Sequence, residues 1–338
     1  MRVMLLAAGR STRLGAIGQL LPKPLVPICG YPAIRFGIAA AVAAGLREIV
    51  INLFHRGQHI RDALGDGAAL GARIAYSEEE ELLGTAGGIA QARAQLGEGA
   101  VVVMNAKVVC DVDLRALVRA HERGAAGNPS DAATLALRDD PRAEEWGPIG
   151  VDRDDHIVRI LGGTAPGQPL PTGVRMFTGI QVIGPTLRAR MRAAFSDTVR
   201  DIYIPALAEG LPIGSVRLDG HFAEHSTPER YLAGNLALLR NPGAIRHPPG
   251  PLVGIDPTAR VHPGATIMHP VRIAAGAEIE SGATVGPEVV IGEVAVVTAG
   301  AHLTRVVVWP AARAAGTIAD AIVTEQGEHP VALVPPHD

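Results

Sequence analysis

Short apolar runs alternate with helical patterns over the first 240 residues or so. The runs expected to form strands are Val3–Ala7, Glu48–Leu53, Arg73–Ser77 and Val101–Asn105. The segments expected to form helices are Pro32–Leu46, His59–Leu64 and Ala86–Leu96. This alternation predicts an α/β domain with a doubly wound, mostly parallel sheet that helices cover on both faces. Because ligands bind at the carboxyl ends of such strands, we expect the site after Ala7, Ser77 and Asn105.

The period of the apolar positions changes to six residues after a Pro-rich stretch that cannot continue a helix or a central strand. Nine aliphatic residues share one register and Trp309 follows them: Ile255, Val261, Ile267, Ile273, Ile279, Val285, Ile291, Val297 and Leu303. Repeats of this kind stack short strands into a solenoid with the aliphatic position inward. The pattern resembles the hexapeptide repeats of left-handed parallel β-helices and implies roughly four coils.

Three parts of the chain are therefore expected. Residues 1–240 form a Rossmann-like α/β domain, residues 241–252 form a Pro-rich linker, and residues 253–338 form a smaller left-handed parallel β-helix. A length of 338 residues agrees with one large and one smaller domain.

Composition narrows the range of partners. With a formal net charge of -3 and 3% aromatic residues, the chain offers neither a basic surface nor an aromatic platform for nucleic acid, and no basic surface for an anionic membrane. No segment approaches the ~20 apolar residues that span a bilayer. Cys29 and Cys110 are too few for a disulfide framework and are expected to be two core thiols in a reducing cytoplasm.

The loop after the first expected strand carries a glycine and basic residues. It contains Ala7, Ala8, Gly9, Arg10, Ser11 and Thr12. Arg13 follows at once, and Lys23 lies shortly after in Pro22–Pro27; Lys23 and Lys107 are the two lysines of the chain. Backbone N–H groups of such a loop can surround phosphates while the side chains supply positive charge. The pattern favours triphosphate binding over a glycine turn with solvated basic residues.

A second glycine-bearing segment follows the third expected strand. Its candidate nucleotide-binding residues are Glu81, Gly84, Thr85, Ala86, Gly87 and Gly88. Because Gly87 and Gly88 lack side chains where a helix is expected to begin, a flat ring could approach closely. The preceding run Glu78–Glu81 is interpreted as a solvated edge rather than a metal cluster.

Two further segments carry opposite charges. Lys107 follows the fourth expected strand, and Glu224 lies in the segment Phe222–Tyr231. Asp111 and Asp113 are close to Lys107 in sequence, but Asp113 is expected to cap a helix over Leu114–Arg123.

Taken in order, these four segments resemble the signature of the sugar-1-phosphate nucleotidyltransferases. The resemblance covers nearly the full length and implies transfer of a nucleotidyl group from a nucleoside triphosphate to a sugar 1-phosphate, with release of pyrophosphate. It further implies that Arg13 binds the outer phosphates, that Lys23 stabilises the transferring phosphate, and that Gly84–Gly88 holds the base. Where this chain has Ser11, the family has glycine.

The family's metal-binding positions are substituted in this chain. A Gly-Asp pair normally stands where this chain has Ala106 and Lys107, and a second aspartate stands where it has Glu224. The resemblance implies two carboxylates that hold magnesium. No dedicated metal site is therefore expected, with Glu224 and Asp111 as the remaining candidates, and the magnesium requirement stays open. We predict that Lys107 and Glu224 form an ion pair and that Lys107 joins Arg13 and Lys23 as a catalytic cation.

The sugar side is implied by shorter matches. Trp146 and Gly147 resemble an aromatic-Gly pair of the family's sugar pocket, and Thr178 and Gly179 stand where the family tends to have Ala and Gly. Since Ile157–Gly163 lacks the Glu-Lys pair that usually contacts the sugar phosphate, an arginine such as Arg138 or Arg175 would have to replace it, although both are also interpreted as surface residues.

Three functions remain open from sequence. The first is an active nucleotidyltransferase in which cations replace magnesium. The second is a non-catalytic relative that binds a nucleotide or sugar nucleotide and acts on a partner such as an active paralogue. The third is acyl transfer on the β-helix through a histidine, with His262, His269 and His302 as candidates that are also typical surface residues. In each case the β-helix is expected to mediate self-association or pairing with the paralogue.

Overall fold

The structure is a computed structural model that describes residues 1–332 except 125–131, 154 and 168–169. The described chain forms two compact units that each draw on three stretches of sequence. The first unit comprises Met1–Arg10, Gly37–Ala106 and Asp111–Gly220, and the second comprises Ser11–Phe36, Lys107–Cys110 and His221 onward. The domain boundaries expected at residues 240 and 252 stay a prediction.

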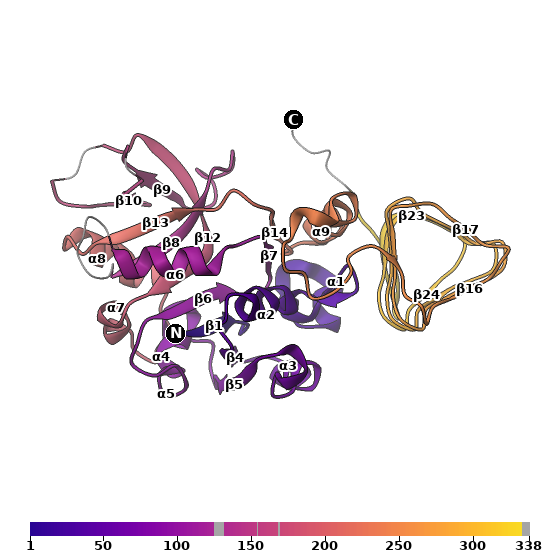
Figure 1. Ribbon diagram of the computed structural model, residues 1–338, viewed down its shortest axis with the longest axis horizontal. Coiled ribbons are helices and arrows are strands. Elements are labelled where there is room, and N and C mark those ends of the chain that lie inside the picture. Colours follow the sequence, from indigo (N-terminus) through magenta and orange to yellow (C-terminus); the bar gives the residue numbers. More distant parts are fainter. Residues whose placement is uncertain (125–131, 154, 168–169, 333–338) are drawn as a thin grey trace. The chain divides into compact units, whose positions relative to one another are not determined.

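The parallel part of the first unit's sheet has the predicted strands. In spatial order these are β5 (Arg73–Glu78), β4 (Glu48–Leu53), β1 (Arg2–Leu6) and β6 (Val101–Asn105), all parallel to their neighbours (Figure 1). The central residues of β4, β1 and β6 are buried on both faces, as their continuous apolar runs indicate, whereas those of the edge strand β5 are exposed or half-buried. The α/β class is thus confirmed.

The remainder of this ten-stranded sheet is mainly antiparallel and was not predicted from the sequence. Its strands are β8 (Ala133–Arg138), β9 (Pro148–Val151), β10 (Ile157–Ile160), β11 (Gly163–Thr164), β12 (Gly173–Ile183) and β13 (Ile213–Arg217). The long strand β12 pairs antiparallel with β6, β8 and β9, so it joins the two parts of the sheet.

Helices cover this sheet. They are α2 (Ala33–Ala43), α3 (Gly57–Leu64), α4 (Gly84–Gln91), α5 (Arg93–Leu96), α6 (Leu114–Arg123), α7 (Pro185–Arg190) and α8 (Ile204–Ala208). Figure 1 shows α6 lying along β8 and β13. The single helix expected over Ala86–Leu96 was wrong, because the backbone leaves the helical region at Ala92, with ψ of 8°, and separates α4 from α5. The predicted cap is confirmed, since the Asp113 carboxylate accepts from the Ala116 N–H at 2.8 Å.

The second unit contains short elements from distant parts of the sequence. They are α1 (Gly15–Leu20), β2 (Pro27–Ile28), β3 (Tyr31–Pro32), β7 (Val108–Cys110), β14 (Phe222–Glu224) and α9 (Pro228–Arg240). Strands β7 and β14 pair antiparallel, and the Thr227 side chain caps α9. One apolar core joins residues of these elements with residues of the following coils.

The rest of the second unit is a parallel β-helix, as predicted. Its strands are β15 (Gly254–Ile255), β16 (Arg260–Val261), β17 (Thr266–Ile267), β18 (Val271–Ile273), β19 (Glu278–Ile279), β20 (Thr284–Val285), β21 (Val289–Ile291), β22 (Val296–Val297), β23 (His302–Val308), β24 (Arg313–Ala314), β25 (Thr317–Thr324) and β26 (Gly327–Pro330). Ile255 pairs with Ile273 and Ile273 pairs with Ile291, so three hexapeptides make one coil. Figure 1 shows the stacked coils end-on as a triangle. The last coil is shorter, because Leu303 pairs with Ile318.

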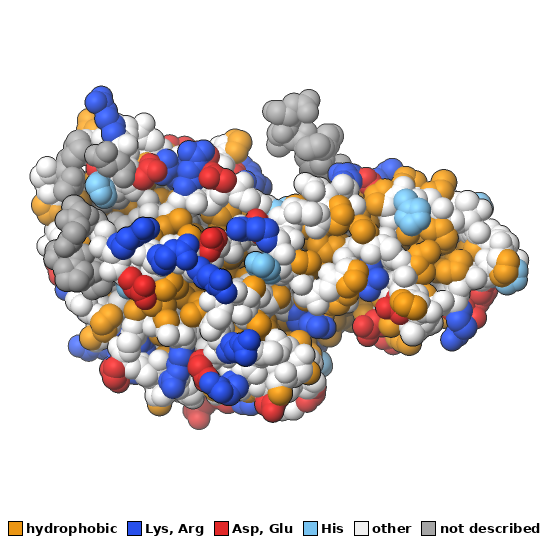
Figure 2. All heavy atoms as spheres, viewed as in Figure 1, with side chains coloured by type: hydrophobic (Ala, Val, Ile, Leu, Met, Phe, Trp, Pro, Cys, Tyr) orange, Lys and Arg blue, Asp and Glu red, His pale blue; other side chains and the backbone are white. Residues whose placement is uncertain are grey.

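The inward register is confirmed in the middle of the β-helix and weakens in its first coil. Residues from Ile273 to Leu303 in this register are buried, whereas Val261 and Ile267 are half-buried and Ile255 is 43% exposed. The aliphatics of the first coil are less buried because its strands pair with only one neighbouring coil among the described residues. Figure 2 shows hydrophobic side chains gathered over the β-helix on the face in view.

Cys29 and Cys110 are buried free thiols, as expected. Among helices in the described ranges, none has the length and apolar character needed to cross a bilayer.

Candidate functional site

Four charged side chains from separate segments of the second unit come together. Arg13 lies in a 3-10 turn (Thr12–Leu14) and Lys23 begins another (Lys23–Leu25). Lys107 precedes β7, and Glu224 ends β14. In this antiparallel pair Val108 is the register partner of Glu224, which brings the neighbouring Lys107 beside the carboxylate. The predicted ion pair is present: Lys107 Nζ donates to Glu224 Oε1.

The Glu224 carboxylate collects three donors or cations on one oxygen. Besides Lys107, Ser226 Oγ donates to Oε1, and Arg13 Nη2 lies 3.9 Å from the same atom. Burial alone would raise the pKa of Glu224, but the Lys107 charge and the hydrogen bonds from Lys107 and Ser226 outweigh it and lower the pKa. Glu224 is therefore a stable anion with cations on one side.

Lys23 is the most buried cation of the group, with 9% of its surface exposed. Burial, followed by the charges of Lys107 and Arg13, lowers the pKa of Lys23 to about 8, while Glu224 acts in the opposite direction. The charged form of Lys23 is therefore disfavoured by burial and by its neighbouring cations. A bound anion would stabilise it, because the attraction between the two charges offsets the loss of hydration.

Ser11 fixes the backbone of Lys23. Its hydroxyl oxygen accepts a hydrogen bond from the Lys23 backbone N–H at 2.9 Å. Ser11 has φ of 57°, in the left-handed region that favours glycine, which fits the glycine of the resembled signature. A Cβ on Gly18 would lie 2.5 Å from the Ser11 carbonyl oxygen, so this turn is closely packed. The sequence did not predict this role of Ser11.

The residues present do not fit a magnesium ion held by the protein. Magnesium requires oxygen ligands, and the ammonium of Lys107 both occupies Glu224 and repels a cation. Asp111 belongs to the first unit. Across the described residues, no three His, Cys, Asp or Glu side chains are grouped as metal ligands would be.

In the first unit, a buried hydrogen-bond network lies at the carboxyl ends of β1, β4 and β5. Asn52 Oδ1 accepts from the Ala7 N–H at 2.8 Å, and Asn52 Nδ2 donates to Glu79 Oε1 at 2.7 Å. Glu79 Oε2 accepts from the Leu83 N–H at 3.0 Å. The interpretation of Glu78–Glu81 as a solvated edge was wrong for Glu79, which is 5% exposed because its carboxylate satisfies these donors.

The glycines of α4 approach the protein's own backbone. A Cβ on Gly87 would lie 2.2 Å from the Ala194 carbonyl oxygen, and one on Gly84 would lie 2.5 Å from that of Ser196. The Thr85 hydroxyl donates to Asp197 and accepts from the Thr198 N–H. Close packing within the first unit is thus one reason for glycine here, and the base-binding role remains a prediction.

The other predicted nucleotide-binding residues belong to the same two glycine-bearing segments. Ala8 follows the end of β1 with Gly9, whose N–H donates to the Ala7 carbonyl, and Arg10 lies with its guanidinium 5.8 Å from the Phe54 ring centre. Glu81 is exposed, and Ala86 is buried within α4.

The predicted sugar-side residues have structural partners. The Arg142 guanidinium lies 4.4 Å from the Trp146 ring centre, and the buried Thr178 hydroxyl donates to the Ala136 carbonyl at 2.7 Å. Gly179 packs against Asn105. Gly147 has φ of 104°.

The arginines considered for a phosphate contact are not free surface cations. Arg175 pairs with Asp139 and Asp155, and Arg138 lies 3.6 Å from Asp140. The interpretation of Arg175 as a surface residue was wrong, because only 12% of its side chain is exposed. His262, His269 and His302 are exposed, as expected for surface histidines.

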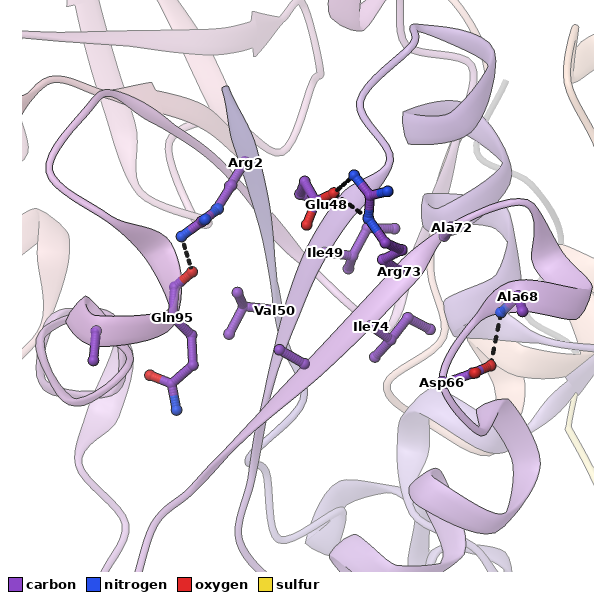
Figure 3. A pocket seen from close by; sticks show the side chains of 12 residues that line it. Arg2, Glu48, Ile49, Val50, Asp66, Ala68, Ala72, Arg73, Ile74 and Gln95 are labelled. Atoms are coloured by element: carbon purple, nitrogen blue, oxygen red, sulfur yellow. Dashed lines mark hydrogen bonds and ion pairs between the residues drawn. The ribbon is translucent and has the colours of Figure 1, made fainter.

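The first unit also has a groove of about 490 Å³, and none of the predicted site residues lines it (Figure 3). Arg2, Glu48 and Arg73, which begin β1, β4 and β5, line it. It therefore opens at the amino ends of the strands, opposite the carboxyl ends where Ala7 and Asn52 lie. Its charged groups have partners, since Arg2 donates to the Gln95 backbone carbonyl and Arg73 donates to the Glu48 carboxylate, as the dashed lines mark.

Comparison with known proteins identifies the family of the chain. The family described as "Nucleotidyl transferase" matches residues 2–161. An N-acetylmuramate alpha-1-phosphate uridylyltransferase of Neisseria meningitidis is 36% identical over 201 residues, which cover 57% of this chain and 86% of that protein. A mannose-1-phosphate guanylyltransferase of Mycobacterium tuberculosis is 28% identical over 290 residues, which cover 84% of this chain and 76% of that protein. The chain belongs to the nucleotidyl transferase family.

Solved structures share the fold. A putative glucose-1-phosphate thymidylyltransferase from Bacillus anthracis superposes with a TM-score of 0.60 at 18% identity, covering 71% of this chain and 96% of that one. HddC from Yersinia pseudotuberculosis, complexed with GMP-PN, gives a TM-score of 0.57 at 19% identity and covers 70% of this chain and 99% of that one.

Proposed function

We propose that this protein binds a nucleoside triphosphate or sugar nucleotide and transfers a nucleotidyl group to a sugar 1-phosphate, with Arg13, Lys23 and Lys107 supplying the positive charge. The observation that carries the proposal is the grouping of these three cations around the single carboxylate of Glu224. The group retains positive charge after the Glu224 pair is formed, and a triphosphate supplies the missing anion.

In the proposed reaction a phosphate oxygen of the sugar 1-phosphate attacks the α-phosphorus of the nucleoside triphosphate. The bond between the α-phosphorus and the oxygen bridging to the β-phosphorus breaks, and pyrophosphate leaves with that electron pair. Such transfer depends on positioning and on stabilisation of phosphate charge rather than on covalent chemistry by the protein. Lys23, which is buried and pinned through its backbone to Ser11, is best placed for the transferring phosphate, while the 62%-exposed side chain of Arg13 suits the outer phosphates.

The names of the relatives select the first substrates to test. GTP with mannose 1-phosphate and UTP with N-acetylmuramate 1-phosphate correspond to the two relatives above. Pyrophosphate release would be followed for each pair with magnesium and with a chelator in its place. Release that depends on Lys23, and that declines less on chelation than in a two-carboxylate relative, is the expected result.

A second function is a relative that binds a nucleotide or sugar nucleotide without turnover. The direct pairing of Lys107 with Glu224 favours it, since it removes a carboxylate from the role that the family signature implies. Equilibrium binding of GTP, UTP and their sugar nucleotides separates the two functions: saturable binding without pyrophosphate release supports the second. Neither binding nor release would contradict both.

The proposal includes a protein partner, either a second copy of the chain or an active paralogue. Self-association, or pairing with an active paralogue, would use the β-helix, where Ile255 and Met268 are exposed apolar residues of the first coil. Sedimentation of the full chain before and after Ile255→Glu tests the first arrangement. A cytoplasmic location also stays a prediction.

A further inference from the structure

The buried network of Asn52 and Glu79 connects the two glycine-bearing segments of the first unit. The network begins at the backbone N–H of Ala7, the first residue after β1, and ends at the backbone N–H of Leu83, the residue before α4. Asn52 is 2% exposed and Glu79 is 5% exposed, so no bulk water competes for these bonds. Three hydrogen bonds in series therefore link the start of one segment to the start of the other.

Each of the three hydrogen bonds of this network uses its own donor and acceptor atoms. Asn52 uses its oxygen for Ala7 and its amide hydrogen for Glu79, and Glu79 uses one oxygen for Asn52 and the other for Leu83. Gly88 packs directly against the pair, since a Cβ there would lie 2.6 Å from Glu79 Oε1 and 2.8 Å from Asn52 Nδ2. The pair thus contacts α4 at its beginning and along its body.

A polar pair in this position requires an explanation beyond packing. Asn52 interrupts the apolar run that follows Glu48 in strand β4, and burial raises the pKa of Glu79 against the hydrogen bonds from Leu83 and Asn52. A buried carboxylate costs stability unless its partners hold it in a defined geometry. What the pair secures is the relative position of two backbone segments that could otherwise move independently.

We infer that Asn52 and Glu79 are positioning residues, which hold the Ala7–Gly9 loop and the Leu83–Gly88 segment in the geometry that binds the nucleotide. The inference rests on the proposed function, because it assigns nucleotide binding to both segments. Neither side chain touches the ligand. They act through the backbone groups that they fix.

The order of donors and acceptors permits a reciprocal exchange. Glu79→Gln alone places an amide donor against either Asn52 or Leu83, and Asn52→Asp alone places two carboxylates side by side. In the double variant N52D/E79Q, the new carboxylate at position 52 accepts from Ala7 and from the new amide at position 79, whose oxygen accepts from Leu83. All three hydrogen bonds are restored with nearly the same volume.

The test measures nucleotide affinity for the four proteins of this double-mutant cycle. Each single variant is expected to lose about tenfold in affinity, the effect of one buried hydrogen bond, and the double variant to regain most of it. Tyr203→Phe is the control, since it removes a buried hydrogen bond to Gln181 elsewhere in the same unit. The control should lower thermal stability and leave affinity unchanged. Single variants that behave like the control, or a double variant no better than the worse single one, would overturn the inference.

Amide hydrogen exchange of the full chain without ligand provides the second measurement. Glu79→Gln and Asn52→Asp should each speed exchange in Ala7–Gly9 and in Leu83–Gly88 together, and the double variant should slow both again. Faster exchange in only one segment would contradict the positioning role. Because this measurement needs no nucleotide, failure of the wild-type protein to bind one would refute the proposed function while the exchange data still decide whether the pair couples the two segments.

Discussion

The hydroxyl of Ser11 accepts a hydrogen bond from the backbone N–H of Lys23 at 2.9 Å, and this contact joins the two basic segments that the sequence separates by a helix. Ser11 holds this position with φ of 57°. This left-handed backbone conformation is unfavourable for serine, and the hydrogen bond offsets part of its conformational free energy.

Ser11→Ala is expected to lower the free energy of unfolding by about 1 kcal/mol, because it keeps the left-handed backbone and loses the hydrogen bond. Ser11→Gly loses the same bond but relieves the backbone, so it should be less destabilising. Urea unfolding of the two variants measures the difference. A glycine variant less stable than the alanine variant would contradict this account.

Lys23 should make nucleotide binding dependent on pH. Its pKa of about 8 in the folded chain is below the ordinary value of 10.5, so the ammonium that attracts phosphate is lost as pH rises through 8. Triphosphate affinity should therefore decline above pH 8. Over the same range, from 8 toward 10.5, the folded chain binds fewer protons than the unfolded chain, and the free energy of unfolding should rise with pH.

The matched control is Lys23→Arg, which stays charged throughout this range. Its affinity profile should be flat between pH 7.5 and 10 apart from changes in the ligand itself, measured by titration calorimetry at each pH. An equally steep decline in this variant would mean that another group titrates.

Replacing Lys107 separates its effect on stability from its effect on metal binding. Lys107→Met leaves the Glu224 carboxylate without its main partner, which should raise the pKa of Glu224 and cost about 2 kcal/mol of stability at neutral pH. The penalty should shrink as pH falls and the carboxyl group takes up a proton. Denaturant unfolding at several pH values measures both effects, and Lys107→Met combined with Glu224→Gln should show little of this pH dependence.

Lys107→Asp tests the substituted metal site directly. It places a second carboxylate beside Glu224 in the position that the family signature gives to aspartate, so magnesium binding should appear or strengthen. Calorimetry with magnesium alone provides the measurement. Unchanged magnesium affinity would show that the site needs more than this one exchange.

Two glycines of the β-helix form a matched pair. Gly286 and Gly300 both have positive φ, but a Cβ on Gly286 would lie 1.8 Å from the Met268 carbonyl oxygen, whereas nothing lies within 4 Å of one on Gly300. Gly300→Ala should cost about 1 kcal/mol for the backbone alone. Gly286→Ala should cost several times as much, since the neighbouring coil has to move. Similar thermal unfolding of the two variants would contradict the close packing between coils.

The sequence predicted those parts of the fold in which one pattern is sufficient. Strands β4 and β6 have the predicted bounds because their apolar runs are buried on both faces, and α6 has them because Asp113 caps it. The register of the β-helix followed from a six-residue period. By contrast, β12 pairs with strands far away in sequence, and no local pattern identifies such partners.

The candidate site was predicted through the resemblance of short motifs and their charges, not through geometry. The pair of Lys107 and Glu224 was predicted because two opposite charges stand at the positions where the resembled family binds magnesium. Glu79 was misinterpreted because it stands in a run of four glutamates, three of which are exposed at least in part, and its burial depends on Asn52 and Leu83. A polar residue inside the apolar strand β4 was the available signal.

Tyr231 connects the last turns of the β-helix to the basic segment of the second unit. Its hydroxyl donates to the Pro27 carbonyl at 2.6 Å and accepts from the Trp309 indole N–H at 2.9 Å. The coils are therefore not an interchangeable appendage. A chimaera that received the tail of a relative would have to provide an indole or another donor at position 309, or the Tyr231 hydroxyl that holds the segment of Lys23 would lose the partner on its other side.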